Sequence, residues 1–249
     1  MTGDNKATAV IFVLNLKSKN GNNIMKVGVN PLFSRSFAIM VFLTMLLAAA
    51  FPLRAKESAN VRERVMIFGD SLSAAYGINP KDGWVALLGA KLAPRGVIVL
   101  NASVTGETSR GGLARIKADL TRLSPTIVVL ALGANDGLRG LPNADTRKNL
   151  DAIINAARAA SARVVLVGIQ IPPNYGLQYA TEFRDMYPEL AAIYKLPFVP
   201  FLLEGFADKL EFFQADRVHP TAAAQPKIVD NVTPAILQAI ATTSGATRR

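Results

Sequence analysis

The residues best suited to proton transfer meet in one short motif. The chain contains a single histidine, His219, in the segment Asp216-Arg217-Val218-His219-Pro220. Imidazole transfers protons near neutral pH and is the usual general base for a hydroxyl nucleophile. The carboxylate of Asp216, three residues earlier, is close enough to reach the second ring nitrogen. If the protein transfers acyl groups through a histidine, His219 is the candidate base and Asp216 orients it.

Three further residues follow short apolar runs, where we expect strands to end. Ser71 lies in Gly69-Asp70-Ser71-Leu72-Ser73, and its hydroxyl and backbone N–H would face the same space. Gly106 offers an unobstructed backbone N–H after the second run, and Asn135 offers an uncharged amide donor after the third. Taken singly, each is more typical of an ordinary turn or helix cap. The serine motif is not Gly-x-Ser-x-Gly, because Ser73 occupies the last position.

The elements that would position these residues alternate along the chain from Arg64 onward. Short β-branched runs are apolar on both faces, as in strands of a sheet that is covered on both sides. They predict strands over residues 65–68, 97–101, 126–132, 163–169 and 198–200. The amphipathic stretches predict helices over residues 83–93, 111–123, 146–160, 179–194 and 221–241. Trp84, at the start of the first helix, is expected in the core.

This alternation predicts right-handed βαβ crossovers and a parallel sheet. We expect an α/β fold, a three-layer α/β/α sandwich with a five-stranded parallel sheet in flavodoxin-like order. Such sheets carry their chemistry in loops at the carboxyl ends of the strands. Ser71, Gly106, Asn135 and the Asp216–His219 motif would then converge on one edge of the sheet. A serine hydrolase requires that arrangement.

Composition excludes several classes of site. The chain has no cysteine, so disulfides, thiolate metal sites and cysteine nucleophiles are absent. With one histidine and no cysteine, a zinc site would have to consist almost entirely of carboxylates, and we expect no metal.

The formal net charge of +10 suggests nucleic acid, but its distribution argues against that partner. Residues 1–55 hold six of the 28 basic residues and one of the 18 acidic ones, and the remaining basic residues are scattered without interleaved aromatics. We therefore expect no nucleic-acid binding. A mild attraction to anionic lipid leaves room for transient membrane contact.

The N-terminal 55 residues have the pattern of an export signal. Residues 37–53 are apolar, follow Arg35 and end in Leu53-Arg54-Ala55, which suits cleavage. The alternative is an uncleaved membrane anchor, for which 17 apolar residues are near the lower limit. Met25, followed by Lys26, would start a more ordinary signal than Met1 does. We expect an extension with a cleaved signal peptide over residues 1–55, a catalytic domain over 60–243, and a periplasmic or secreted protein.

Together, these motifs resemble the four sequence blocks of the GDSL, or SGNH, hydrolase superfamily. The blocks are matched by Gly69-Asp70-Ser71-Leu72-Ser73, Gly106, Gly133-Ala134-Asn135-Asp136 and Asp216-Arg217-Val218-His219-Pro220, over about residues 63–240. Within the superfamily the chain is most similar to the exported, multifunctional thioesterase-I/lysophospholipase/arylesterase type. Segments that support this are Trp84-Val85-Ala86-Leu87-Leu88, Asn101-Ala102-Ser103 and Pro172-Pro173-Asn174-Tyr175-Gly176. Ala134 departs from the glycine that is common there.

The resemblance implies a serine esterase that needs no metal or cofactor. Ser71 would be the nucleophile, and His219 would act first as base and then as acid while Asp216 orients it. The oxyanion hole would comprise the backbone N–H groups of Ser71 and Gly106 and the side chain of Asn135. Small carboxylic esters or thioesters would be hydrolysed through an acyl-serine intermediate, and we expect a monomer.

Two loops are candidates for the substrate-binding wall. Pro173 and Tyr175 lie after the fourth strand, and Leu138 lies after the third. The residue pattern of the first loop, with Pro173 and Tyr175, is explained equally well by a loop that proline stiffens and that packs on the core. Their apolar character favours short-to-medium acyl chains and aryl esters over polysaccharide acetyl groups. The alternatives are a carbohydrate O-acetylesterase and a non-catalytic lipid- or glycan-binding module, although such a module predicts loss of a catalytic residue and none is missing.

Overall fold

The computed structural model describes residues 63–246. The signal peptide and N-terminal extension predicted over residues 1–55 lie outside these described residues. Within residues 63–246, no helix combines the length and the apolar character that crossing a membrane requires.

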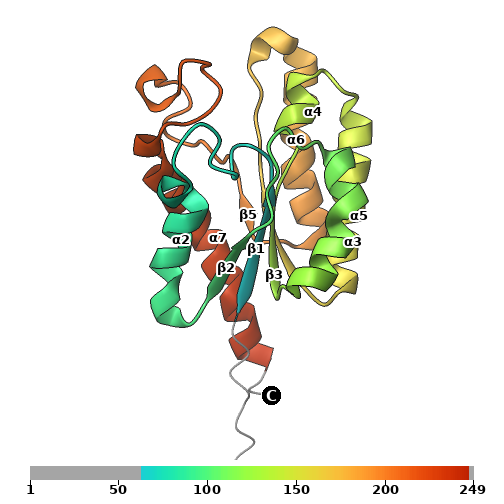
Figure 1. The fold of residues 1–249 in the computed structure, drawn as a ribbon. Helices are drawn as coiled ribbons and strands as arrows, with labels where there is room; N and C mark the ends of the chain where they lie inside the picture. Colours follow the sequence, from blue (N-terminus) through green and yellow to red (C-terminus); the bar gives the residue numbers. More distant parts are fainter. Residues whose placement is uncertain (1–62, 247–249) are drawn as a thin grey trace, which may run out of the picture. The chain divides into compact units, whose positions relative to one another are not determined.

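A parallel five-stranded sheet forms the centre of the described domain (Figure 1). Its strand order is β2-β1-β3-β4-β5, and every neighbouring pair is parallel, which confirms the predicted sheet and its flavodoxin-like order. The strands are β1 (Arg64–Gly69), β2 (Ile98–Asn101), β3 (Ile127–Ala131), β4 (Arg163–Val167) and β5 (Phe198–Val199).

Helices cover both faces of this sheet. In Figure 1, α2 and α7 lie on one side of the strands, and α3, α5 and α6 lie on the other. The five predicted helices are present, as α2 (Trp84–Leu92), α3 (Ser109–Leu123), α5 (Asn143–Ala159), α6 (Leu177–Tyr194) and α7 (Gln225–Ala246). The last begins later than predicted, because residues Ala222–Ala224 form a separate 3₁₀ turn. A short helix that we did not predict, α4 (Ala134–Leu138), follows β3.

The core lies between the sheet and its two helical layers. Every residue of β3 is buried, as is the apolar stripe of α5, which consists of Leu150, Ile153, Ile154 and Ala157. Trp84 is fully buried, as predicted, and its indole N–H donates to the carbonyl of Leu72 at 3.1 Å. This bond attaches α2 to the loop that carries Ser71.

The strand order explains where a site can form. The chain passes from β1 outward to β2 and then crosses back over β1 to β3, so the connections after β1 and β3 diverge to opposite faces of the sheet. Ligands in such sheets bind at the carboxyl ends of the strands where this divergence occurs. Ser71 follows β1 and Asn135 follows β3, so both lie at this point.

Candidate active site

Ser71 lies in a tight turn that its neighbour Asp70 organises. The backbone N–H groups of Ser73 and Ala74 donate to the Asp70 carbonyl at 3.1 and 3.0 Å, and the N–H of Leu72 donates to the Asp70 carboxylate at 3.0 Å. The helix α2 starts only at Trp84, so the serine is held by a turn and not by a helix terminus. This turn fixes both the hydroxyl and the backbone N–H of Ser71 at the edge of the sheet.

A hydrogen-bonded chain joins Ser71, His219 and Asp216. The Oγ of Ser71 lies 2.9 Å from Nε2 of His219, and Nδ1 of the same ring lies 2.7 Å from Oδ2 of Asp216. When Nδ1 carries the proton and donates it to the carboxylate, Nε2 is left to accept the hydroxyl proton. The structure therefore brings the predicted nucleophile, base and orienting carboxylate together in the order that nucleophile activation requires.

The Asp216 carboxylate is held by its own loop. Its Oδ1 accepts backbone N–H groups from Val218 at 2.9 Å and from His219 at 3.0 Å, while Oδ2 faces the imidazole. The backbone N–H of His219, followed by that of Val218 and by the imidazole, lowers the pKa of Asp216 well below its ordinary value. The carboxylate thus stays ionised at neutral pH.

The loops that carry Gly106 and Asn135 are tied to each other. The side-chain amide of Asn135 donates to the carbonyl of Glu107 at 3.0 Å, and the guanidinium of Arg139 donates to the carbonyl of Gly106 at 3.1 Å. Gly106 has a φ of +77°, in the region that favours glycine. These bonds hold the Gly106 peptide and the Asn135 amide in a defined relation, although only Asn135 lines the cavity that contains Ser71.

The short helix α4 is anchored beside Asn135. The buried carboxylate of Asp136 accepts the backbone N–H of Ser109 at 2.8 Å and the hydroxyl of Ser109 at 2.5 Å. Because Ser109 is the first residue of α3, this contact fastens α4 to the neighbouring helix. The position of the Asn135 amide therefore depends on two helices, α3 and α4.

A second buried carboxylate, that of Asp70, lies behind the serine. Its Oδ2 has no hydrogen-bond partner among the described residues. Burial, with a smaller contribution from the charge of Asp136, raises the pKa of Asp70 from 3.8 to about 7. Asp70 is therefore a neutral acid over much of the range in which an exposed aspartate is charged.

This raised pKa predicts a pH-dependent effect of Asp70→Asn on stability. Between about pH 4 and pH 7 the folded protein binds more protons than the unfolded chain, so parental stability falls as pH rises through this window and levels off above it. Asparagine keeps the acceptor for Leu72 but cannot ionise. The melting temperature of the variant relative to the parent should rise by roughly 5 °C between pH 5 and pH 8.

Thermal unfolding at pH 5, 6, 7 and 8 measures this difference. The exposed Asp82→Asn is the control, since Asp82 lies at the surface in the 3₁₀ turn Pro80–Asp82. If the melting temperatures of Asp70→Asn and the parent differed by the same amount at every pH, the raised pKa of Asp70 would be contradicted.

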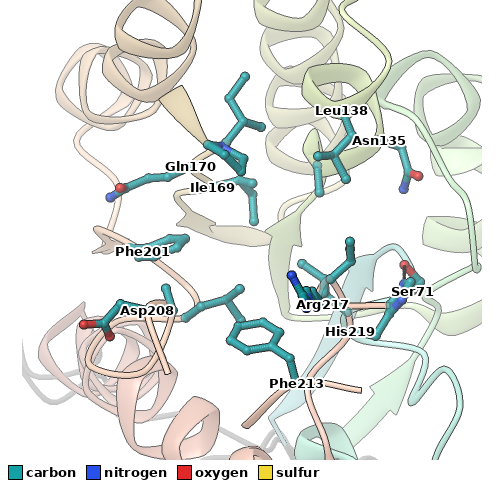
Figure 2. A pocket seen from close by; sticks show the side chains of 17 residues that line it. Ser71, Asn135, Leu138, Ile169, Gln170, Phe201, Asp208, Phe213, Arg217 and His219 are labelled. Atoms are coloured by element: carbon teal, nitrogen blue, oxygen red, sulfur yellow. Dashed lines mark hydrogen bonds between the residues drawn. The ribbon is translucent and has the colours of Figure 1, made fainter. Parts of the chain in front are cut away.

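An apolar cavity of about 450 Å³ opens beside the serine. Figure 2 shows Ser71 and His219 at one end of it, and Gln170 and Asp208 at the end away from Ser71. The rest of the lining is mainly hydrophobic, with side chains from the segments that follow β1, β3, β4 and β5: Leu72, Ala134, Leu138, Ile169, Ile171, Pro172, Phe201, Leu203, Phe213 and Val218. Such a shape suits an elongated apolar group whose reactive carbon lies at Ser71.

The predicted substrate-binding residues are only partly in this lining. Leu138 lines the cavity, but the loop after β4 contributes Pro172 and not Pro173 or Tyr175. The latter two lie in the 3₁₀ turn η3 (Pro173–Tyr175), and Tyr175 is 41% exposed. From the sequence we did not predict the part of the cavity wall that residues 201–213 form. Its signal was a cluster of phenylalanines between the last strand and the histidine motif, without helical or strand periodicity.

Within the part of the chain that the structure describes, no group of three or more His, Asp or Glu side chains is arranged to hold a metal ion. The imidazole of His219 contacts the Ser71 hydroxyl and the carboxylate of Asp216, and the amide of Asn135 lines the same cavity.

Comparison with known proteins gives concordant matches. Residues 67–225 match the GDSL-like lipase/acylhydrolase family. Esterase TesA of Pseudomonas aeruginosa is 47% identical over 176 residues, which cover 70% of this chain and 88% of that protein. Thioesterase 1/protease 1/lysophospholipase L1 of Escherichia coli K12 is 39% identical over 194 residues, covering 78% of this chain and 87% of that protein.

Solved structures have the same fold. The esterase EstA from Pseudoalteromonas sp., in a crystal structure inhibited by monoethylphosphonate, is 39% identical and has a TM-score of 0.68. The match covers 71% of this chain and 97% of that one.

Proposed function

This chain belongs to the GDSL-like lipase/acylhydrolase family and is a serine ester hydrolase, and on that premise we propose that it cleaves short-to-medium acyl esters and thioesters with Ser71 as nucleophile. The observation that carries the assignment is the chain Ser71 Oγ–His219–Asp216 at the end of an apolar cavity. His219 is the base, then the acid, and Asp216 orients it.

The proposed reaction begins with attack of Ser71 Oγ on the carbonyl carbon, while Nε2 of His219 takes the hydroxyl proton. Asp216 stabilises the imidazolium that forms. The backbone N–H groups of Ser71 and Gly106 and the amide of Asn135 serve as donors to the developing oxyanion. The tetrahedral intermediate then collapses, and the alcohol or thiol leaves with the proton from His219.

The second half of the reaction uses the same groups in reverse roles. His219 removes a proton from water, which attacks the acyl-serine ester, and the second tetrahedral intermediate releases the carboxylic acid. Ser71 recovers its proton from the imidazolium. No step draws on a group other than the side chains, the backbone N–H groups and water.

The apolar lining supports the proposed acyl preference. Each methylene that the cavity removes from water contributes about 0.8 kcal/mol to binding. An acetyl group would leave most of the wall between Ile169 and Phe213 without contacts, whereas a medium chain would cover it. With the acyl chain in this cavity, the leaving group would lie outside it, so an alcohol, a phenol or a thiol is compatible with the site.

A substrate panel tests this preference. We expect kcat/KM to rise by at least about 10-fold from p-nitrophenyl acetate to p-nitrophenyl octanoate, as several added methylenes enter the cavity. Octanoyl-CoA and lysophospholipid should also be hydrolysed. Equal activity on acetate and octanoate, together with release of acetate from acetylated xylan, would favour the carbohydrate O-acetylesterase instead.

We also propose that the protein is exported to the periplasm or medium and acts as a monomer, with at most transient contact to membrane lipid. Support comes from the apolar segment 37–53 and the small-residue site that follows it. N-terminal sequencing of protein from the periplasmic and membrane fractions distinguishes a cleaved signal from an anchor.

A further inference from the structure

The side chains of His219 and Asp216 lie close to solvent. The side chain of Asp216 is 40% exposed, and that of His219 is 18% exposed. Water competes for hydrogen bonds at such positions, so the bonds to Asp216 and Ser71 alone hold the imidazole less firmly than they would in a dry core. Further contacts from the protein would therefore help to restrict the ring.

Tyr76 supplies one such contact. Its ring centroid lies 4.4 Å from that of His219, with the two planes tilted by 42°. Tyr76 itself is 47% exposed and is not among the residues that line the acyl cavity. The ring thus covers a face of the imidazole without belonging to the hydrophobic core or to the substrate pocket. When His219 becomes an imidazolium, the adjacent aromatic ring attracts the new charge.

Gln214 joins the two loops that carry Tyr76 and His219. Its side-chain amide donates to the carbonyl of Tyr76 at 2.8 Å and to that of Pro220 at 3.2 Å. Its own backbone N–H donates to the carbonyl of His219 at 2.8 Å. Gln214 therefore closes the loop that carries His219 (the histidine loop) and fastens it to the loop that carries Ser71 and Tyr76 (the serine loop).

The serine loop is shaped to receive this amide. Gly77 has a φ of +73°, and a Cβ there would lie only 2.1 Å from Oε1 of Gln214. Any other residue would have to displace the glutamine. Glycine at this position therefore allows the close approach as well as the backbone conformation.

We propose that Tyr76 and Gln214 are positioning residues that form a clamp between the serine loop and the histidine loop and hold His219 in line with Ser71. The proposal rests on the proposed function of Ser71 and His219 and adds residues that act through His219 without touching substrate. Because the clamp lies outside the acyl cavity, it acts on turnover and not on substrate binding.

Kinetics of four single variants test the clamp: Tyr76→Ala, Tyr76→Phe, Gln214→Ala and the control Ile193→Ala, which removes an exposed apolar side chain from α6. Loss of one aromatic contact corresponds to a roughly 3- to 10-fold lower kcat. We expect that loss in Tyr76→Ala and Gln214→Ala with an unchanged KM for p-nitrophenyl butyrate. Tyr76→Phe keeps the ring and should retain parental kcat, as should Ile193→Ala.

Three further measurements separate positioning from general destabilisation. The rate at which a fluorophosphonate labels Ser71 should fall in parallel with kcat, while melting temperatures change little. The double variant Tyr76→Ala/Gln214→Ala should lose less than the product of the single losses, because both residues act through the position of one ring. If Tyr76→Ala does not fold, Tyr76→Leu replaces it.

Several results would overturn the clamp. They are parental kcat in Tyr76→Ala, a defect in Tyr76→Phe as large as that in Tyr76→Ala, or an effect confined to KM. If Ser71→Ala kept activity, the proposed function itself would fail. If Ser71 were essential but Tyr76→Ala had parental kinetics, only the clamp would fail.

Discussion

His219→Ala is expected to lower kcat by about 10⁶-fold and to leave the protein folded. His219 is the only histidine of the chain, so no other imidazole can take the proton from Ser71. The ring contacts Ser71 and Asp216 near the surface, and its removal opens little of the core. Residual turnover should reflect only substrate binding and the oxyanion donors.

The measurement is hydrolysis of p-nitrophenyl butyrate, with circular dichroism and thermal unfolding as checks of the fold. Imidazole added to the buffer should restore part of the activity, since the truncated side chain leaves a solvent-accessible space beside Ser71. Imidazole should not stimulate the parent or a variant that lacks the serine hydroxyl. Turnover within 10-fold of the parent in His219→Ala would exclude the histidine as base.

Ser71→Ala is expected to cause a loss of the same order, because the serine and the histidine act as one unit and their effects do not add. The parent should react with a fluorophosphonate at Ser71, and the variant should not react. Peptide mass spectrometry of the labelled parent identifies the modified residue. The double variant Ser71→Ala/His219→Ala should be no less active than either single variant.

Ser73→Ala is a matched control in the same turn. The hydroxyl of Ser73 is buried two residues away and has no hydrogen-bond partner among the described residues. Its removal should leave both labelling and turnover close to those of the parent. If labelling persisted in Ser71→Ala and disappeared in Ser73→Ala, the nucleophile would be Ser73 and not Ser71.

The architecture could be predicted largely from the sequence. Buried strands such as β3 are continuous apolar runs, and α5 shows one apolar stripe, so their types follow from periodicity alone. The handedness of βαβ connections then leaves few topologies. The helix α4 was missed because five residues are too few to show a period, and because glycines at 133 and 137 are typical of a turn.

The candidate site, too, could be predicted only in part from the sequence. The segments around Ser71, Asn135, Asp216 and His219 resemble the family's sequence blocks, and this resemblance indicated the family. The carboxyl ends of parallel strands lie at one edge of the sheet, which is why Ser71 and Asn135, each following a strand, were expected to lie close together. The acyl cavity was harder to predict. Its wall between residues 201 and 213 has no regular pattern, and Pro173 and Tyr175, which the sequence favoured, lie outside its lining.

The sequence by itself therefore determined the fold, the family and the candidate reacting groups, because these depend on local periodicity and on residue type. Only the tertiary structure decided the 2.9 Å approach of His219 to Ser71, the raised pKa of Asp70 and the contact between Tyr76 and the imidazole. The physical reason is that each depends on packing between segments far apart in the chain. Burial, distance and orientation are properties of that packing, and no local pattern of residues encodes them.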